Sequence, residues 1–513
     1  MKNNPKPAKI VAMMMAITIV GKLLGVLRDR MQSTQFGADT AEAIAFAQAS
    51  ALPRTFLDIM FAAAFSASFI PVFSAYLETK GKKAAFDLAS LFLSVVLVLT
   101  AGVAVLSMAL AQPIFTLSVG SGELPYGTIS LGVTLLRFMF PLMIFSGLAF
   151  SFTGILQSLG EFRAPAAMSV VSNAIILVYY FFFIDRFGVY GLAVAFLIGW
   201  GCQALMQVPF LVKHKFRFRF HINLKDPGLL QIGRLALPVM ISTWVVPINV
   251  MVNVRAAAPL YGGEFGVPAI HFANSLFMII SGIFILSVSN VVFPKLSRQA
   301  AAKDSRGFGD TINETVRVLL FFLLPLTLGI MTLSRPLVGM VFGGGDFGYT
   351  AVTITGRALF FFAMGIVGYG LFAVLSRACY AMMDGRTPIA AAVVAIGVNA
   401  VLSFALAPVM DIAGPALAAA AAQTVGAGIL VVSLTRKGVL TWPRATVADI
   451  GKMLAIALVM FAVVYIALGY MGGLHVVLQV GICGILGLVL YIGLAALLRI
   501  KEMRWLAKNL LRR

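Results

Sequence analysis

The sequence predicts an all-α polytopic membrane protein of about 14 transmembrane helices, built as two parallel six-helix repeats plus two C-terminal helices. Of the 513 residues, 60% are hydrophobic and only 11% are charged. The mean hydropathy of +0.98 lies far above that of soluble globular chains. Apolar stretches long enough to cross a bilayer, roughly 20 residues each, recur along the chain, and several motifs repeat at a constant interval.

The apolar stretches predict the individual spans. They cover residues 10–33, 41–75, 85–112, 127–157, 164–184, 187–212, 229–260, 266–294, 309–333, 348–382, 388–409, 412–435, 447–471 and 474–498. Backbone groups in lipid must be hydrogen-bonded internally, and these runs lack the alternation of a barrel strand, so we expect helices. The basic N-terminus with its apolar run resembles a signal peptide, but no small-residue cleavage site follows, and we expect the first helix to be retained.

Charges in the connections predict the orientation. Alternate connections are rich in cations, which are Lys80, Lys82, Lys83, Arg163, Lys213, Lys215, Arg217, Arg219, Lys225, Lys295, Arg298, Lys303, Arg306, Arg386, Arg436, Lys437 and Arg444. The other connections carry mostly acids, such as Asp39, Glu123 and Asp346. This positive-inside pattern predicts that both termini are cytoplasmic. It also explains most of the net charge of +20, which argues against a nucleic-acid partner.

An internal repeat divides the chain. Glu161-Phe-Arg-Ala-Pro165 matches Asp384-Gly-Arg-Thr-Pro388 at a shift of 388 − 165 = 223, and Pro71 matches Pro294 at the same shift, 294 − 71 = 223. We therefore expect an N-terminal six-helix lobe at 1–223, a C-terminal six-helix lobe at 224–446, and two more helices with a basic cytoplasmic tail at 447–513. Even-numbered repeats point the same way, an arrangement known in transporters, which bind substrate between the repeats near the midplane.

The segment that joins the two lobes alternates cationic or polar residues with apolar ones, from Lys215 to Leu224. One interpretation is an interfacial linker whose apolar face lies in the headgroup region. The sharper alternative is a specific site for anionic lipid.

The first span contains four ionisable residues, Lys22, Arg28, Asp29 and Arg30. A mid-membrane Arg or Lys costs roughly 2.5 to 3.5 kcal/mol on insertion scales, so such residues usually face a bundle interior or a wet cavity. Gly21 and Gly25 remove side-chain bulk beside them. Either the glycines form a packing seam and Arg28 pairs with a nearby acid, or the cations line a cavity that receives an anion. Three cations meet only one acid here, which favours the cavity.

Two further arginines lie in spans. Arg54 and Asp58 in the second span are spaced i, i+4 and can pair along one helix face. They form either an internal ion pair or a unit in which Asp58 orients Arg54 toward the cavity. Arg255 in the seventh span is the counterpart of Arg28 in kind, though not in register. The predicted substrate-binding residues are thus Lys22, Arg28, Arg54 and Arg255, supported by Gly21, Gly25, Asp29 and Asp58.

Enzymatic signatures are missing from the sequence. It has no Gly-x-x-x-x-Gly-Lys-[Ser/Thr] phosphate loop, and no cluster of acids or histidines suited to metal or acid–base chemistry. We therefore expect a secondary-type transporter that is not an enzyme, with no metal and no cofactor. The membrane potential or an ion gradient would drive transport.

Three motifs carry a resemblance to a known family. Leu23-Leu-Gly-Val-Leu-Arg-Asp29 with Phe36-Gly37, Phe65-Ser-Ala-Ser-Phe-Ile-Pro71, and Asp384-Gly-Arg-Thr-Pro388 with Asn399 resemble the MurJ (MviN) lipid II flippases of the multidrug/oligosaccharidyl-lipid/polysaccharide exporter superfamily. The likeness spans essentially the whole chain. It implies movement of the undecaprenyl-diphosphate-linked peptidoglycan precursor to the outer leaflet of the bacterial cytoplasmic (inner) membrane, for cell-wall synthesis and cell shape.

The resemblance also assigns residues. The family's cationic cavity residues correspond to Lys22, where an Arg is common, and to Arg28. The family's second-helix Arg falls on Leu57 or Asp58, with Arg54 one turn away. The eighth-helix motif Tyr-Ala-x-Arg-Leu reads Phe272-Ala-Asn-Ser275-Leu, so its Arg is replaced, and Arg255 is the residue that could compensate.

Together these observations predict alternating access between two lobes, with a central cavity that receives the diphosphate of lipid II. The two extra helices would hold the lipid tail, and cell-wall synthesis proteins are candidate partners. Three alternatives stay open: a flippase for another polyprenyl-diphosphate glycan, a drug/cation antiporter, which would need acids in the cavity, and a membrane scaffold whose charges are structural.

Overall fold

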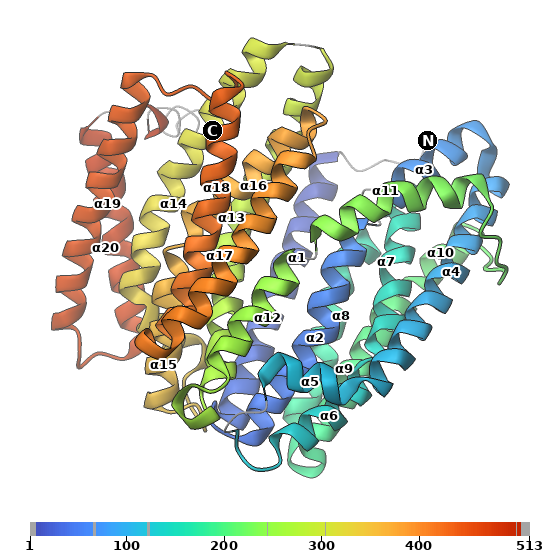
Figure 1. Ribbon diagram of the computed structural model, residues 1–513, viewed down its shortest axis with the longest axis horizontal. Helices are drawn as coiled ribbons and strands as arrows, with labels where there is room; N and C mark the ends of the chain where they lie inside the picture. Colours follow the sequence, from blue (N-terminus) through green and yellow to red (C-terminus); the bar gives the residue numbers. More distant parts are fainter. Residues whose placement is uncertain are drawn as a thin grey trace. The chain divides into compact units, whose positions relative to one another are not determined.

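The computed structural model describes residues 7–64, 68–120, 124–243, 245–302, 304–498 and 500–503. Its regular structure in these residues is helical, apart from one isolated bridge between Gly344 and Phe347 (Figure 1). The chain forms two compact units. The first contains Met1–Ile248 and Gly262–Val267, and the second contains Asn249–Tyr261 and Pro268–Arg513. The predicted all-α fold is confirmed, whereas the lobe boundaries at 223 and 446 stay a prediction of the repeat.

The first unit is built from eleven helices in the described residues. They are α1 (Pro7–Phe36), α2 (Ala41–Ala64), α3 (Ile70–Thr79), α4 (Gly81–Ala109), α5 (Ala111–Val119), α6 (Thr128–Met139), α7 (Leu142–Ser158), α8 (Arg163–Phe182), α9 (Ile184–Leu205), α10 (Val208–Lys213) and α11 (Pro227–Thr243). In this unit α1 packs along α8, α8 packs along α9, and α2 packs against α6 and α7.

The remaining helices belong mainly to the second unit. They are α12 (Val245–Ala257), the 3-10 turn η2 (Leu260–Gly263), α13 (Gly266–Ala301), α14 (Ser305–Phe342), α15 (Tyr349–Ala363), α16 (Ile366–Ala381), α17 (Arg386–Met410), α18 (Ala413–Arg436), α19 (Arg444–Tyr470) and α20 (Val476–Leu497). The helices α19 and α20 pack on α14 through a core that includes Phe321, Met453, Ala457 and Tyr491.

Helix starts reproduce the sequence repeat. The helix α17 begins 386 − 163 = 223 residues after α8, α14 begins 305 − 81 = 224 after α4, and α16 begins 366 − 142 = 224 after α7. The two halves also break at matching places, since α6 ends just before Phe140 and α15 just before Met364, which is 364 − 140 = 224 residues later. The helix boundaries therefore recur at the interval of the motifs to within one residue.

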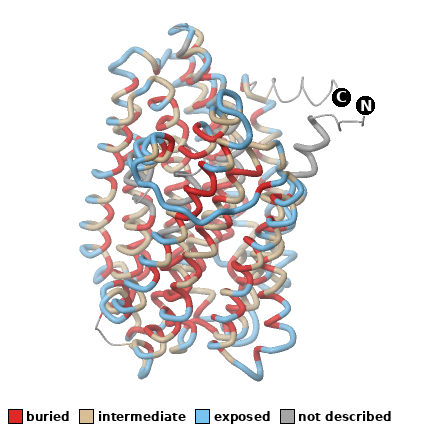
Figure 2. The backbone as a smooth tube through the Cα atoms, turned by 90° about the vertical axis from the view of Figure 1, so that its right-hand side faces the viewer, coloured by how far each residue is buried: buried red, intermediate tan, exposed pale blue. Residues whose placement is uncertain are grey.

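Nine helical segments in the described residues are long and apolar enough to cross a membrane, or ten if the bent pair α15 and α16 counts as one span. The bend between α15 and α16 is 45°. Buried and exposed positions follow one another along the helices (Figure 2). Many exposed positions of α4, α17, α19 and α20 carry large apolar side chains. Such faces suit contact with lipid, so the chain is a multi-pass membrane protein. The count of fourteen spans stays a prediction.

Candidate functional site

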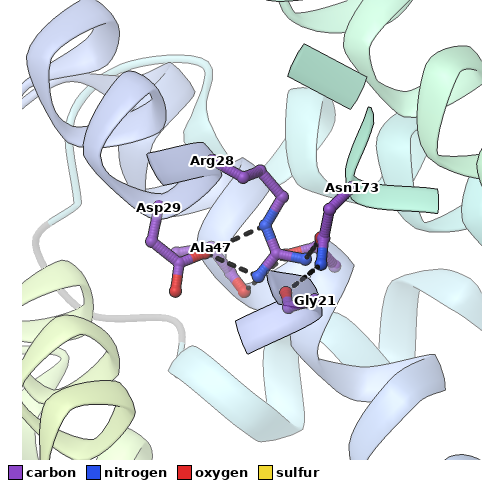
Figure 3. A network of polar contacts seen from close by, with 6 residues as sticks. Gly21, Arg28, Asp29, Ala47 and Asn173 are labelled. Atoms are coloured by element: carbon purple, nitrogen blue, oxygen red, sulfur yellow. Dashed lines mark hydrogen bonds and ion pairs between the residues drawn. The ribbon is translucent and has the colours of Figure 1, made fainter. Parts of the chain in front are cut away.

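The Arg28 guanidinium is the centre of a polar network inside the first unit (Figure 3). Arg28 is 8% exposed and Asp29 is 5% exposed. The Nε and Nη2 groups of Arg28 donate to Oδ1 of Asp29 at 3.0 and 2.6 Å. Its Nη1 group donates to Oδ1 of Asn173 on α8 at 2.9 Å. Two acceptors on different sides therefore fix the plane of the guanidinium fork.

Asn173 connects this network to the backbone of α1. Its Nδ2 group donates to the carbonyl oxygen of Gly21 at 3.1 Å, and Asn173 itself is buried. The oxygen of the same amide accepts from Arg28, so one side chain holds two points of α1 that lie about two turns apart. Charge-based sequence analysis missed Asn173 because a neutral amide carries no charge signal. The repeat gives no signal for it either, because Asn173 lies eight residues after Pro165 whereas Asn399 lies eleven residues after Pro388.

Gly21 allows α1 to approach α8 closely, whereas Gly25 is not needed for this approach. A Cβ atom on Gly21 would lie 2.2 Å from the Oγ of Ser169 and 3.2 Å from its Cβ, whereas one on Gly25 would meet Asn173 at an ordinary 3.5 Å. The packing-seam interpretation of Gly21 therefore agrees with the geometry. That interpretation also expects Arg28 to pair with a nearby acid, and Asp29 is this acid. Contact of Arg28 with a substrate stays a prediction.

Arg28 and Arg54 share an aromatic wall on α9. The Cζ atom of Arg28 lies 5.7 Å from the ring centroid of Phe196, and that of Arg54 lies 5.3 Å from Trp200. The two rings stack at 5.7 Å with an interplanar angle of 10°, and Phe46 of α2 meets Phe196 edge-on at 5.2 Å. Cations over such rings are attracted by the ring quadrupole. The i, i+4 spacing of Phe196 and Trp200 was the available sequence signal for this wall.

The other predicted residues are Lys22, Asp58 and Arg255. Lys22 is exposed on α1, and the side chain of Asp58 lies outside the described part, so its predicted pairing with Arg54 stays a prediction. Arg255 is partly buried on α12 and belongs to the second unit. The structure thus brings together Arg28, Asp29 and the two glycines, and it places Arg54 on the same aromatic wall.

The second unit contains a related arrangement around Asn399. The Nδ2 group of Asn399 on α17 donates to the carbonyl oxygen of Asn249 on α12 at 3.3 Å. The Oγ group of Ser403 donates to Oδ1 of Asn253 at 3.1 Å. In both units, an Asn on the helix that follows the repeated Pro motif therefore holds a backbone carbonyl of a helix that carries an arginine, Arg28 in one and Arg255 in the other.

No group of three or more His, Cys, Asp or Glu side chains that could hold a metal ion occurs in the described residues. The chemistry that the Arg28 network offers is the binding of anionic oxygens. A planar guanidinium presents paired donors that match carboxylate and phosphate oxygens.

Solved structures share the fold of the protein. The chain is similar to "Lipid II flippase MurJ, inward closed conformation", with a TM-score of 0.80 at 22% identity over 94% of this chain and 98% of that one. It is also similar to an inward-facing multidrug resistance MATE family transporter of the MOP superfamily, with a TM-score of 0.70 at 15% identity over 83% of this chain and 98% of that one. The fold is therefore that of the MOP-superfamily transporters.

The family model and the sequence relatives show to which family the chain belongs. The family model described as "Lipid II flippase MurJ" matches residues 32–482. "Probable lipid II flippase MurJ" of Vibrio cholerae is 28% identical over 73% of this chain and 72% of its own length. "Lipid II flippase MurJ" of Burkholderia cenocepacia is 26% identical over 73% of each. The chain belongs to the lipid II flippase MurJ family, as the sequence motifs predicted.

Proposed function

We propose that this chain moves lipid II, the undecaprenyl-diphosphate-linked peptidoglycan precursor, to the outer leaflet of the bacterial cytoplasmic membrane by alternating access. The family match over residues 32–482 supports the assignment, as do relatives from several bacteria that carry the same name. In this role both termini lie in the cytoplasm, in line with the positive-inside charge pattern. Cell-wall synthesis proteins are candidate partners.

The Arg28 network is the observation that carries the mechanism. A buried cation without a partner costs several kcal/mol, so the empty transporter needs an internal acceptor for it. Asp29 and Asn173 fill that need and hold the guanidinium in one plane. When substrate arrives, a diphosphate oxygen replaces one of these acceptors, and Arg28 gains a charge-assisted bond without prior reorientation. Lys22, Arg54 and Arg255 contribute the remaining positive charge.

The transport cycle requires no catalysis and no cofactor. The substrate carries negative charge on its diphosphate, so the membrane potential or an ion gradient can supply the driving energy. The two helices outside the repeat, α19 and α20, carry large exposed apolar side chains such as Tyr465, Ile485 and Val489. They would hold the polyprenyl tail while the lobes alternate.

Complementation tests the proposal directly. A host depleted of its own lipid II flippase is supplied with this chain, and outer-leaflet lipid II is measured. We expect lipid II exposure to return. A chain that inserts at normal levels but leaves lipid II in the inner leaflet would disprove the peptidoglycan role, and restored export of another polyprenyl-diphosphate glycan would point to the alternative substrate.

Substitutions in the same assay test the site. Arg28→Ala removes one charge-assisted interaction worth about 1.5 to 3 kcal/mol, so we expect transport to fall by roughly 10- to 100-fold. Arg28→Lys should retain part of the activity because it keeps the charge but loses the fork. Arg186→Ala, at an exposed position on α9, is the matched control and should transport normally. Normal transport by both Arg28→Ala and Arg255→Ala would rule out the cationic site.

A further inference from the structure

A segment of residues 215–226, here called the strap, joins α10 to α11 and contains no helix. It is the green coil at the right of Figure 1, and an exposed tube crosses the front of Figure 2, which looks onto this side. Both ends and the helices that it touches belong to the first unit. Its alternating sequence is compatible with a plain linker and with a lipid site. The contacts of the strap show which of its side chains face away from the helices.

Two contacts fix the course of the strap along α4. Phe216 is buried and packs edge-on against Phe86, with 5.2 Å between the ring centroids. Five residues later, the backbone N–H of His221 donates to the Oγ of Ser94 at 3.2 Å. Phe86 and Ser94 are eight residues apart on α4, which is about 12 Å along a helix axis. The strap therefore follows α4 over more than two turns and is held at both points.

The outward side of the strap is both apolar and cationic. Phe218, Phe220, Ile222 and Leu224 are between 47% and 64% exposed. The cations that flank them are also exposed, and these are Lys213, Lys215, Arg217, Arg219 and Lys225. The Nζ atom of Lys82 joins this surface, since it lies 5.3 Å from the ring centroid of Phe86.

No acidic side chain balances these charges within the strap before Asp226. The Oδ1 atom of Asp226 accepts from the backbone N–H groups of Gly228 and Leu229 at 2.8 and 3.1 Å. That carboxylate therefore caps the start of α11. The outward surface of the strap keeps a net positive charge, and a complementary occupant must be anionic.

The backbone of the strap determines its depth in the membrane. Among the described residues, no backbone–backbone hydrogen bond involves Arg217 to Ile222. Backbone groups without such partners do not lie in hydrocarbon, while four large apolar side chains do not suit bulk water. The boundary between headgroups and acyl chains satisfies both requirements.

We propose that the strap is a binding surface for anionic phospholipid headgroups. Phosphate oxygens accept from Arg217, Arg219 and the strap N–H groups, and the apolar side chains insert between the acyl chains below. The segment between α10 and α11 is thereby held at the leaflet that contains the anionic phospholipids. This inference rests on the membrane location of the chain and is independent of the transported substrate.

Quenching by brominated lipids in reconstituted bilayers tests the surface. Phe220→Trp places a reporter on the strap, and Phe404→Trp places one on an exposed position of α17, each compared with the parent chain. Brominated phosphatidylglycerol is titrated against brominated phosphatidylcholine. One basic residue near a membrane surface favours anionic over neutral lipid by about fivefold. We therefore expect brominated phosphatidylglycerol to quench the Trp at residue 220 severalfold more effectively than brominated phosphatidylcholine. This preference should decrease at high salt. The Trp at residue 404 should show no preference.

Charge variants complete the test. Arg217→Gln with Arg219→Gln should lower the preference at residue 220 severalfold, whereas Arg217→Lys with Arg219→Lys should keep it. Gel filtration and circular dichroism check that each variant is folded. Equal quenching of the reporter at residue 220 by the two lipids in the chain with both arginines, or a preference that the double Gln substitution leaves unchanged, would overturn the proposal. Only purified chain and lipid are present, so an acidic protein partner cannot produce a positive result.

Discussion

At the scale of single residues, Arg28 couples charge to helix packing. Its fork contacts an acid on its own helix and an amide 145 residues away. Local spacing in the sequence identified Arg28, Asp29 and both glycines. It gave no signal for Asn173 and only a weak one, the i, i+4 spacing, for Phe196 and Trp200, because these residues act through contacts that only the folded helices create, and neutral or aromatic residues in apolar spans look like ordinary core.

Asn173→Ala should weaken the first unit. The change removes the hydrogen bonds of the Asn173 amide to the Arg28 guanidinium and to the Gly21 carbonyl oxygen. A buried donor left without its partner lowers the free energy of unfolding by about 1 to 3 kcal/mol. Thermal unfolding in detergent measures this loss. In a double-mutant cycle, Arg28→Ala and Asn173→Ala should be clearly non-additive because the side chains touch. Additive effects would mean that the bond contributes little.

At the scale of elements, the contact of α1 with α8 predicts a difference between two neighbouring glycines. Gly21→Ala forces a Cβ against Ser169, and overpacking of this kind costs about 1 to 3 kcal/mol. Gly25→Ala is the matched control, since its Cβ would meet only an ordinary contact. We expect a lower melting temperature for Gly21→Ala, little change for Gly25→Ala, and partial recovery when Ser169→Ala accompanies Gly21→Ala. Equal effects of the two single changes would refute the close approach at Gly21.

The repeated Pro motif works as a helix start, and its acid predicts a pH dependence. Asp384 accepts from the Thr387 backbone N–H at 3.1 Å and from its hydroxyl at 2.6 Å, and it pairs with Lys437 at the end of α18. The Lys437 ammonium and the Thr387 hydroxyl lower the pKa of the Asp384 carboxyl to about 2. Because the folded pKa is below the unfolded one, the stabilisation is complete above about pH 4 and is lost toward pH 2.

Asp384→Ala should therefore lower the unfolding free energy by about 1 kcal/mol at neutral pH, mainly through the lost cap, since Lys437 is half exposed and the ion pair adds little. Melting curves of the parent and the variant from pH 8 to pH 3 measure the difference. It should be constant from pH 8 to 5 and shrink below pH 4. A difference that changes between pH 5 and 8 would assign the effect to another group.

At the scale of the whole molecule, the repeat made the architecture predictable. Composition identified the membrane environment, and the 223-residue interval anticipated where the helices of the second half begin, as α8 and α17 show. The exact ends of the helices were harder to predict from the sequence. The predicted span 348–382 is in fact two helices bent by 45° between Ala363 and Ile366, because hydropathy records the apolar run but not the turn within it.

A buried charge network links α14 to α19 and to the residues just after α20. Arg317 on α14 pairs with Asp449 on α19 at 3.2 Å and with Glu502, just after α20, at 2.6 Å. All three side chains are at most 14% exposed. Removal of one partner from a buried ion pair typically costs 3 to 5 kcal/mol, because the remaining charge stays buried.

Arg317→Met should consequently loosen the two C-terminal helices, since it removes the Arg317 partner of Glu502 and leaves Asp449 with the half-exposed Lys452 at 3.9 Å. Hydrogen exchange of α19 and α20, compared with α17 as an internal reference, should rise strongly in this variant. The triple change Arg317→Met, Asp449→Asn and Glu502→Gln removes the charges of all three buried side chains and should recover much of the protection. If the single and triple variants exchange alike, the network does not hold these helices, and the apolar core around Met453 and Tyr491 alone carries their attachment.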